Sequence, residues 1–145
     1  MFPNDANPHG TLFGGALMAM MDIQAGIAAS HYCHKMVVTA STEAVDFKVP
    51  IKVGERVETI SRVVFVGRTS MVVRVDAYSE HPLSGKRKRC TTAYFNMVAL
   101  DEDGMPTDVP PLVVETEDER REYALAAAIK QAAMERKQRQ KDSES

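Results

Sequence analysis

Residues 12–31 form the segment that most constrains how this chain can fold. Its apolar side chains and alanines cover nearly every direction around a helical axis. A helix that is apolar on all sides belongs inside a protein or inside a membrane. The segment also carries three glycines, Asp22 and Gln24, and a carboxylate at the centre of a bilayer costs at least about 2.5 kcal/mol. We therefore expect a buried helix of a cytoplasmic protein.

After Lys35 the sequence changes to β-branched residues and to alternation of apolar with polar residues, which predicts strands. Four segments show this pattern: residues 36–51 (one strand or a bent pair), 56–66, 71–78 and 89–100. The short connection Gly67-Arg68 suits a type II′ turn, so we expect antiparallel neighbours. A curved sheet around the apolar helix would leave edges and apolar surface exposed, which predicts an oligomer.

A second helix is expected to begin near Thr116, whose hydroxyl and Glu119 form a T-x-x-E capping box. The charged end, residues 136–145, is expected to be frayed. We divide the chain into one domain over residues 1–115 and a C-terminal helix with a charged tail over residues 116–145.

The charge and cysteine content exclude several classes of function. The net charge is only −2, which provides no general attraction for nucleic acid or for an anionic membrane. The two cysteines, Cys33 and Cys90, lie far apart and outside any C-x-x-C spacing. We therefore expect no disulfide framework, no zinc site and a reducing compartment.

Asp22 is the most informative single residue, because it stands in the middle of the expected buried helix. Gln24 lies about 200° further around the axis, so the two polar side chains face different directions. If the helix is enclosed, at least one of them is in a restricted environment. Asp22 is then either a simple surface or backbone-bonded residue, or one of the buried carboxylates among which acid-base groups are found.

The start of the helix adds a second candidate element. Gly14 and Gly15 either permit tight packing or leave helix-terminal amides free to stabilise an oxyanion. Gly15 and Asp22 are seven residues apart, which is about 10 Å along a helix. One carbonyl cannot lie within hydrogen-bonding distance of both, so two chains must contribute if both groups act on the same bond.

Several short motifs occur in a fixed order along residues 3–111. They are Pro3-x-Asp5-Ala6-Asn7-x-x-Gly10-x-x-Phe13-Gly14-Gly15, Met21-Asp22, Val37-Val38-Thr39, Val45-Asp46-Phe47-x-x-Pro50, Val53-Gly54, Val66-Gly67-Arg68-Thr69-Ser70 and, more loosely, Thr92-Ala93-Tyr94-Phe95 with Met97-Val98-Ala99-Leu100-Asp101 and Gly104. Together they resemble the acyl-CoA hydrolase branch of the hotdog-fold thioesterases.

This resemblance implies an α+β hotdog fold, in which a long helix is wrapped by a curved antiparallel sheet, with the C-terminal helix added. It implies hydrolysis of acyl-CoA thioesters to free fatty acid and CoA at a site shared by two subunits. No metal and no cofactor would be needed. The implied partners are the acyl-CoA substrate and further copies of the chain, in a dimer or in a trimer of dimers, without nucleic acid or membrane.

Carried over residue by residue, the resemblance assigns roles to four catalytic positions. Asp22 matches the catalytic carboxylate, as general base or as direct nucleophile. Asn7 matches the polar residue that the opposite subunit contributes, the Gly15 amide matches an oxyanion donor, and Thr39 matches a supporting hydroxyl. The segment that would line the CoA site consists of Gly67, Arg68, Thr69 and Ser70.

The chain departs from the family pattern in one respect, because family members usually have a first strand before the motif at Pro3. Either that strand is absent or the chain is truncated, and the two alternatives predict different strands at one edge of the sheet. The basic run of residues 86–89 either receives nucleotide phosphates or is a solvated loop.

Two other functions remain open on the same scaffold. One is a non-catalytic acyl-CoA-binding or sensing module. The other is a hydratase or dehydratase, which normally needs a histidine beside the carboxylate; no histidine occurs in the turns before Asp22. The joint presence of Asn7, Gly15 and Asp22 favours the hydrolase.

Overall fold

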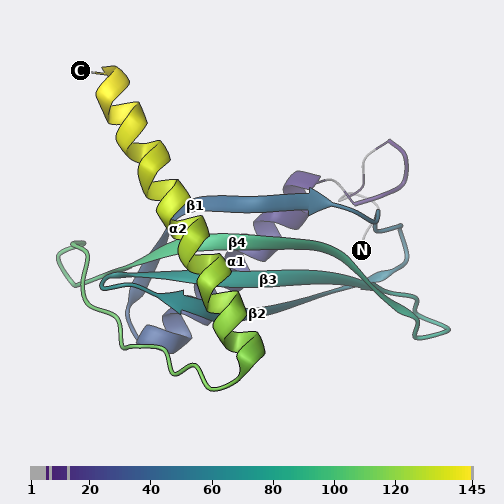
Figure 1. The fold of residues 1–145 in the computed structure, drawn as a ribbon. Helices are drawn as coiled ribbons and strands as arrows, with labels where there is room; N and C mark the ends of the chain where they lie inside the picture. The colour runs from purple at the N-terminus through teal and green to yellow at the C-terminus, as the bar shows by residue number, and fades with distance from the viewer. Residues whose placement is uncertain (1–5, 7, 13, 145) are drawn as a thin grey trace.

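The computed structural model describes residues 6, 8–12 and 14–144, apart from the side chains of Ala44 and Val45. In chain order the elements are α1 (Gly14–Cys33), β1 (Met36–Phe47), β2 (Arg56–Val66), β3 (Ser70–Glu80), β4 (Arg87–Leu100) and α2 (Glu117–Glu144). The described strands form one antiparallel sheet in the order β1-β4-β3-β2. Figure 1 shows α1 behind this sheet and α2 in front of it.

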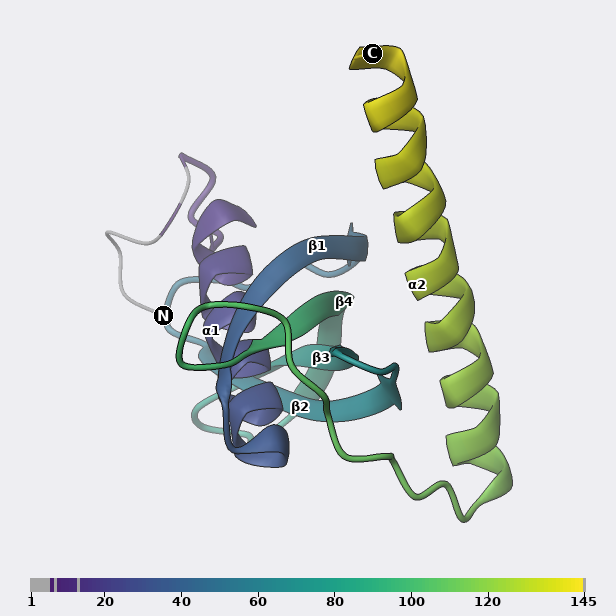
Figure 2. The same ribbon diagram turned by 90° about the vertical axis from the view of Figure 1, so that its left-hand side faces the viewer.

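The sheet curves around α1, as predicted (Figure 2). Alternate residues of β3 and β4 point toward the helix, and they are fully buried because both strands are central in the sheet. The inward set comprises Met71, Val73, Val75, Ala77, Ala93, Phe95, Met97 and Ala99. We call this side of the sheet the inner face. Most of its buried side chains are apolar, and they form the main hydrophobic core of the domain.

Helix α1 presents two different stripes, each repeating every four residues. Leu17, Met21, Ala25, Ala29 and Cys33 are buried against the sheet. The opposite stripe is exposed and includes Gly15, Ala19, Ile23, Ile27 and His31. Ile23 and Ile27 are 61% and 57% exposed. One chain therefore covers only one side of a helix that is apolar all round.

The boundaries of two elements differ from the prediction for identifiable reasons. Helix α1 begins at Gly14 rather than at Leu12, because Leu12 donates its backbone N–H to the Ile51 carbonyl over 2.7 Å and lies in an extended bridge with Ala6. Strand β1 ends at Phe47 rather than at Ile51. Two register shifts interrupt its pairing with β4, so β1 is a bent edge strand.

The β2–β3 connection is antiparallel, as predicted, but the predicted type II′ turn is wrong. The loop has three residues, and Gly67 does not adopt the positive φ that a type II′ turn requires. The glycine is needed for space, since a Cβ at this position would lie 2.9 Å from the Ser70 Oγ. The loop is closed by the Gly67 N–H, which donates to the Ser70 carbonyl over 2.8 Å.

Helix α2 begins where its capping signal predicts, although the signal forms only in part. The Thr116 hydroxyl accepts the Glu119 N–H at 3.0 Å. The Glu119 carboxylate accepts the N–H of Glu115, at 3.4 Å, rather than that of Thr116. The expectation of a frayed end is wrong, because the helix continues to Glu144 and side-chain hydrogen bonds four residues apart support its last turns.

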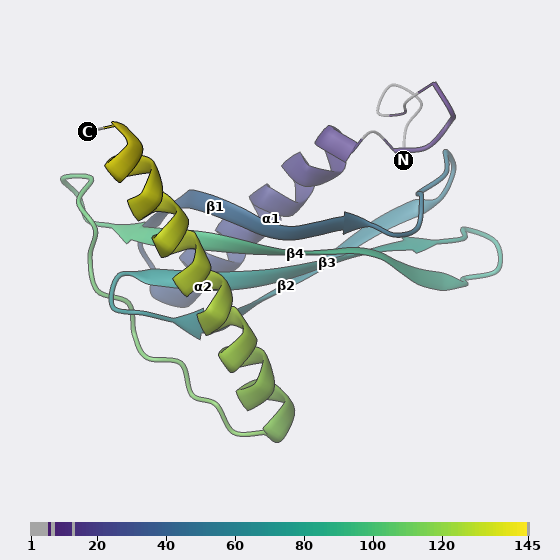
Figure 3. The same ribbon diagram turned by 45° about the horizontal axis from the view of Figure 1, so that its top comes forward.

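Helix α2 crosses the opposite side of the sheet, the outer face, obliquely from β2 toward β1 (Figure 3). Its N-terminal half carries Ala126, which is buried with Val64, Val72 and Tyr94. Next to them, the rings of Phe65 and Tyr123 lie 4.9 Å apart. This second apolar cluster is much smaller than the inner core.

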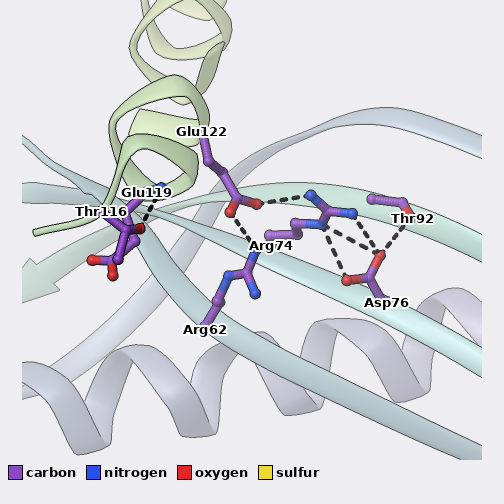
Figure 4. Close-up of polar contacts among 7 residues, drawn as sticks. All are labelled: Arg62, Arg74, Asp76, Thr92, Thr116, Glu119 and Glu122. Carbon is purple, nitrogen blue, oxygen red and sulfur yellow. Dashed lines mark hydrogen bonds and ion pairs between the residues drawn. The ribbon is translucent and has the colours of Figure 1, made fainter. Parts of the chain in front are cut away.

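Charged groups complete the contact between α2 and the outer face. Figure 4 shows Glu122 between Arg62 and Arg74, and Arg74 also reaches Asp76. The Arg74 to Glu122 distance is 2.8 Å, and the Thr92 hydroxyl donates to Asp76 over 2.5 Å. Burial by itself lowers the pKa of Arg74, but hydrogen bonds to Glu122 and Asp76 outweigh it, so the net shift of its pKa is upward.

Residues 101–116 connect the two sides of the sheet. The Tyr32 hydroxyl, on α1, donates to the Pro110 carbonyl over 2.9 Å, and Lys35 donates to the Asp108 carbonyl over 2.5 Å. This segment then runs around the sheet to the start of α2 (Figure 2). Within the described part of the chain, no helix is both long and apolar enough to cross a membrane.

Candidate active site

The structure brings Asp22 and Thr39 into direct contact. The Thr39 hydroxyl donates to Asp22 Oδ1 over 2.7 Å, and the Met97 sulfur lies 3.3 Å from the same hydroxyl. Asp22 follows the fully buried Met21 in α1 and is itself half-buried. Its carboxylate therefore lies at the rim of the core, where one oxygen is held by a fixed donor.

Asp22 and Gln24 are both half-buried and flank the exposed Ile23 in α1. The Asp22 side chain faces the edge strand β1 through Thr39, whereas the backbone carbonyl of Gln24 accepts a 3.4 Å hydrogen bond from the Ser61 hydroxyl of β2. Helix α1 thus lies diagonally between the two edge strands. Asp22 is directed toward the edge that bends most.

Apolar surface that this chain does not cover surrounds the Asp22 and Thr39 pair. Ile23 is next to Asp22 in α1, and Val38, which precedes Thr39, is 47% exposed. Met36 at the start of β1 is 75% exposed. A carboxylate bordered by uncovered apolar side chains differs from an ordinary solvated surface aspartate, because anything that covers this surface also encloses the carboxylate.

The glycines at the start of α1 have separate environments. A Cβ on Gly14 would contact the Phe47 ring at 3.4 Å, so this glycine permits close packing of β1 on the helix. Gly15 is exposed in the first turn of α1, where backbone N–H groups lack helical partners. Asn7 lies outside the described residues. Gly15 and Asp22 occupy one continuous helix, as the sequence predicted, and are therefore about 10 Å apart along its axis.

The segment predicted to bind CoA lies on the outer face and not beside Asp22. Residues Gly67, Arg68, Thr69 and Ser70 line a surface cavity of about 450 Å³, together with Lys130 and Met134 of α2. The Arg68 carbonyl accepts the Val109 N–H, at 2.9 Å, and the Thr69 carbonyl accepts the Ala99 N–H, at 3.0 Å. The backbone of this loop is thus fixed, while its side chains border the cavity.

The basic run of residues 86–89 lies at the other end of the sheet from Thr39, as the β4 register shows. It contributes Lys86 and Lys88 to a surface cavity of about 690 Å³ that Lys52 and His81 also line. Among the residues that the structure describes, no group of three or more histidine, cysteine or acidic side chains is arranged to hold a metal ion.

Comparison with known proteins identifies the family. The model of the family described as "Thioesterase superfamily" matches residues 9–86, which is more than half of the chain. The chain belongs to the thioesterase superfamily.

Similar proteins support this assignment along nearly the whole chain. This thioesterase-superfamily chain is 42% identical to the uncharacterized acyl-CoA thioester hydrolase YkhA of Bacillus subtilis, over 99% of this chain and 82% of that protein. It is 39% identical to the cytosolic acyl coenzyme A thioester hydrolase of Rattus norvegicus, over 83% of this chain but only 32% of the longer rat protein.

Solved structures show the same architecture. An acyl-CoA hydrolase from Bacillus cereus is similar with a TM-score of 0.91 and 37% identity, over 99% of this chain and 87% of that one. An acyl-CoA hydrolase from Staphylococcus aureus, solved with butyryl coenzyme A and coenzyme A, gives a TM-score of 0.84 and 38% identity, covering 99% and 86%. Alanine variants of that hydrolase at an asparagine, a threonine and an aspartate have also been solved.

Sequence reasoning about this superfamily member missed the basic side of α2. Lys130, Lys137 and Lys141 line a cleft between α2 and the outer face. Their spacing of seven and four residues places them near one side of a helix, and this signal was available in the sequence. The sequence did not show whether this lysine side of α2 faces the sheet or the solvent, because that depends on how Glu122 holds α2 against the sheet.

Proposed function

We propose that this chain hydrolyses acyl-CoA thioesters to a free acid and CoA, in an oligomer where two subunits complete each active site. The observation that carries the proposal is the Thr39 hydrogen bond to Asp22, on a half-buried helix position bordered by uncovered apolar surface. The 36–42% identity to proteins named as acyl-CoA thioester hydrolases supports the reaction.

The chemistry requires attack on the thioester carbonyl carbon and departure of the thiolate. Asp22 removes a proton from water as the water oxygen bonds to that carbon, or its own oxygen attacks and water later cleaves the anhydride. In either route the C–S bond breaks and the CoA thiolate takes up a proton. Thr39 engages Oδ1, so that Oδ2 is the oxygen directed to the reaction. The Gly15 N–H stabilises the oxyanion from the first turn of a helix.

A second chain is needed because Gly15 and Asp22 of one helix are too far apart to act on one carbonyl. The proposal takes Gly15 and Asn7 from one subunit and Asp22 with Thr39 from the other. The exposed stripe with Ile23 and Ile27 supports such an interface, since it is apolar and adjoins Asp22. A solved acyl-CoA thioesterase of 40% identity is described as hexameric, in agreement with a trimer of dimers.

The remaining parts of the proposal concern CoA and location. Gly67, Arg68, Thr69 and Ser70 bind the CoA portion, supported by the cavity that they line and by the Staphylococcus aureus relative solved with coenzyme A. The steps use only side chains, one amide and water, so the proposal includes no metal or cofactor. We place the reaction in the cytoplasm, in keeping with the free thiols of Cys33 and Cys90.

Thiol release from acyl-CoA substrates of different chain lengths tests the reaction. We expect Asp22→Asn to lower kcat at least about 100-fold, because a positioned acid-base group contributes on that scale. The melting temperature and oligomeric state should match the unsubstituted protein. Asp103→Asn, in an exposed turn, is the matched control and should retain activity. Absence of turnover by the unsubstituted protein, with acyl-CoA still bound, would instead assign a binding module.

Mixing two inactive variants tests the shared site. Asp22→Ala and Asn7→Ala homo-oligomers are mixed after dissociation, so that some dimers contain one chain of each. If Asn7 acts across the interface, one site in each mixed dimer is intact, and random pairing restores about a quarter of the activity. No recovery, with mixed dimers demonstrated by mass spectrometry, would place both residues in the same chain's site.

A further inference from the structure

The C-terminal half of α2 and the outer face of the sheet enclose a cleft that none of the proposed catalytic groups uses. Its larger part has a volume of about 670 Å³, with Ser41, Asn96 and Val98 on the sheet side. The smaller cavity, which Arg68 borders, shares Lys130 and Met134 with it. We call these two neighbouring cavities together the α2 cleft, which extends from the β2–β3 loop to β1.

The helix side of the α2 cleft is cationic where a packed helix would be apolar. Apolar contact with the sheet ends at Ala126 and Ile129, and Lys130, Lys137 and Lys141 follow on the cleft side. Among the described residues, none of these three lysines has an ion-pair partner, whereas Arg136 pairs with Glu43 of β1. Burial first, and then repulsion from Lys137, lowers the pKa of Lys130. The cleft therefore holds positive charge without a neutralising acidic side chain.

The sheet side of the α2 cleft contains an unsatisfied polar group. Asn96 is only 1% exposed, and its Nδ2 donates to the Ser41 hydroxyl over 2.8 Å. Its Oδ1 has no hydrogen-bond partner among the described residues. Buried carbonyl oxygens rarely stay without a donor in folded proteins, so this oxygen is an independent indication that a polar molecule enters the cleft.

We propose that the α2 cleft binds the phosphate groups of a nucleotide, and that in the proposed reaction this nucleotide is the phosphorylated adenosine end of CoA. This assignment rests on the proposed function. Lys130 and Lys137 neutralise the phosphates, and Arg68, at the loop end of the cleft, can pair with phosphate through two N–H groups. A volume of several hundred Å³ is of the size that holds a small organic ligand.

Position favours the α2 cleft over the basic loop of residues 86–89. Ser70 pairs with Val98, and Val98 pairs with Val38, the neighbour of Thr39. The loop end of the cleft and the Asp22 and Thr39 pair are thus at the same end of the sheet, two strand spacings apart along it and on opposite faces. Lys86 and Lys88 lie at the other end.

Calorimetric titration of the full-length protein tests the site directly. The variants are Lys130→Gln/Lys137→Gln and, as a matched control on the same helix, Arg139→Gln, which is exposed and does not line the cleft. The probes are CoA, 3′-dephospho-CoA, pantetheine and ADP. We expect the double variant to bind CoA about tenfold more weakly, with a shallower salt dependence, and the control to bind as the unsubstituted protein does.

Kinetics distinguish the two possible sources of the phosphates. If CoA of the substrate occupies the cleft, the ratio of KM for acyl-CoA to KM for acyl-pantetheine rises about tenfold in the double variant. If that ratio does not change while ADP binding weakens, a free nucleotide is the ligand and the assignment to CoA is overturned.

Three results would overturn the site itself. They are unchanged CoA and ADP affinity in the double variant, an equal loss in Arg139→Gln, and a loss confined to Lys86→Gln/Lys88→Gln, which would move the phosphates to the basic loop. Binding is measured without turnover. A protein that binds CoA through Lys130 and Lys137 but hydrolyses no thioester would refute the proposed function and leave the cleft assignment intact.

Discussion

The inner and outer faces of the sheet each carry one helix, and the two helices are held by different forces. On the inner face, Met21 of α1 meets Phe95 and Met97 in a fully buried apolar core. On the outer face, α2 has one small apolar cluster, and carboxylate and guanidinium groups centred on Glu122 supply the rest of its contact. Apolar burial is strong and non-directional, whereas charged contacts are weaker and fix geometry.

This difference assigns a different task to each face. The inner face provides most of the stability and holds Asp22 at its rim. The outer face holds α2 in one orientation, with its lysines over the sheet, and contributes less to the stability of the domain. If this division is correct, substitutions on the inner face should unfold the whole domain, and those on the outer face should loosen α2 alone.

The largest effect is expected from Phe95→Ala. Phe95 is fully buried in the inner core, and its removal leaves a cavity, so the free energy of unfolding should fall by about 3–5 kcal/mol. Denaturant unfolding at fixed protein concentration measures the change. Leu83→Ala, at a side chain that is 92% exposed, is the control and should stay within about 0.5 kcal/mol. A loss below about 1 kcal/mol for Phe95→Ala would contradict the division.

Glu122→Gln should have the next largest effect, about 1–3 kcal/mol, since hydrogen bonds between charged groups are lost and Arg74 stays partly buried. Hydrogen exchange resolves where the loss occurs, and we expect faster exchange in α2 with little change in α1. Glu117→Gln, which breaks only an exposed pair with Arg120, is the matched control. Equal acceleration in both helices would show that the faces unfold as one unit.

Thr116→Ala removes the cap of α2 and should cost about 1 kcal/mol. Thermal unfolding followed by circular dichroism measures the loss. Thr116→Ser keeps the hydroxyl and should recover most of it. If serine fails to restore stability, the hydroxyl bond to the Glu119 N–H is not what starts the helix.

Lys130→Gln should have the smallest effect and the opposite sign, a gain of up to about 0.5 kcal/mol near neutral pH. The pKa of Lys130 is lowered in the folded chain, so the unfolded chain binds more protons and the stability of the unsubstituted protein rises with pH in that window. The gain should shrink as pH approaches the ordinary lysine value of 10.5.

Melting temperatures of both proteins between pH 7 and 10.5 measure this trend, with Lys88→Gln as an exposed control. A gain that grows with pH would show that Lys130 is stabilised in its charged form. That result would also weaken the case for an uncompensated cationic cleft.

The elements themselves could be predicted from local patterns. The apolar helix, the four strands and the start of α2 at Thr116 follow from periodicity and capping, which depend on neighbours in sequence. The boundaries at Leu12 and Phe47 could not be predicted, because they depend on pairing with residues 51 and 90–92.

The site was predictable to a smaller extent. Asp22 is conspicuous because it interrupts an apolar helix, but its contact with Thr39 joins residues 17 positions apart and depends on the bent register of β1. The α2 cleft depends on the contact of Glu122 with Arg62, 60 positions away. The family motifs indicated Thr39, whereas no motif indicated Lys130.

Because α1 has one buried and one exposed stripe, the direction in which Asp22 points depends on the number of residues that precede it in the helix. Inserting or deleting one residue before Asp22 would rotate the rest of the helix by about 100°. Asp22 would then turn away from Thr39, and the place of Ala25 against the sheet would be taken by Gln24 after an insertion or by Gly26 after a deletion. Natural variants of this chain should therefore tolerate exchanges of side chain within α1 but confine gains and losses of residues to the connecting segments, such as residues 101–116.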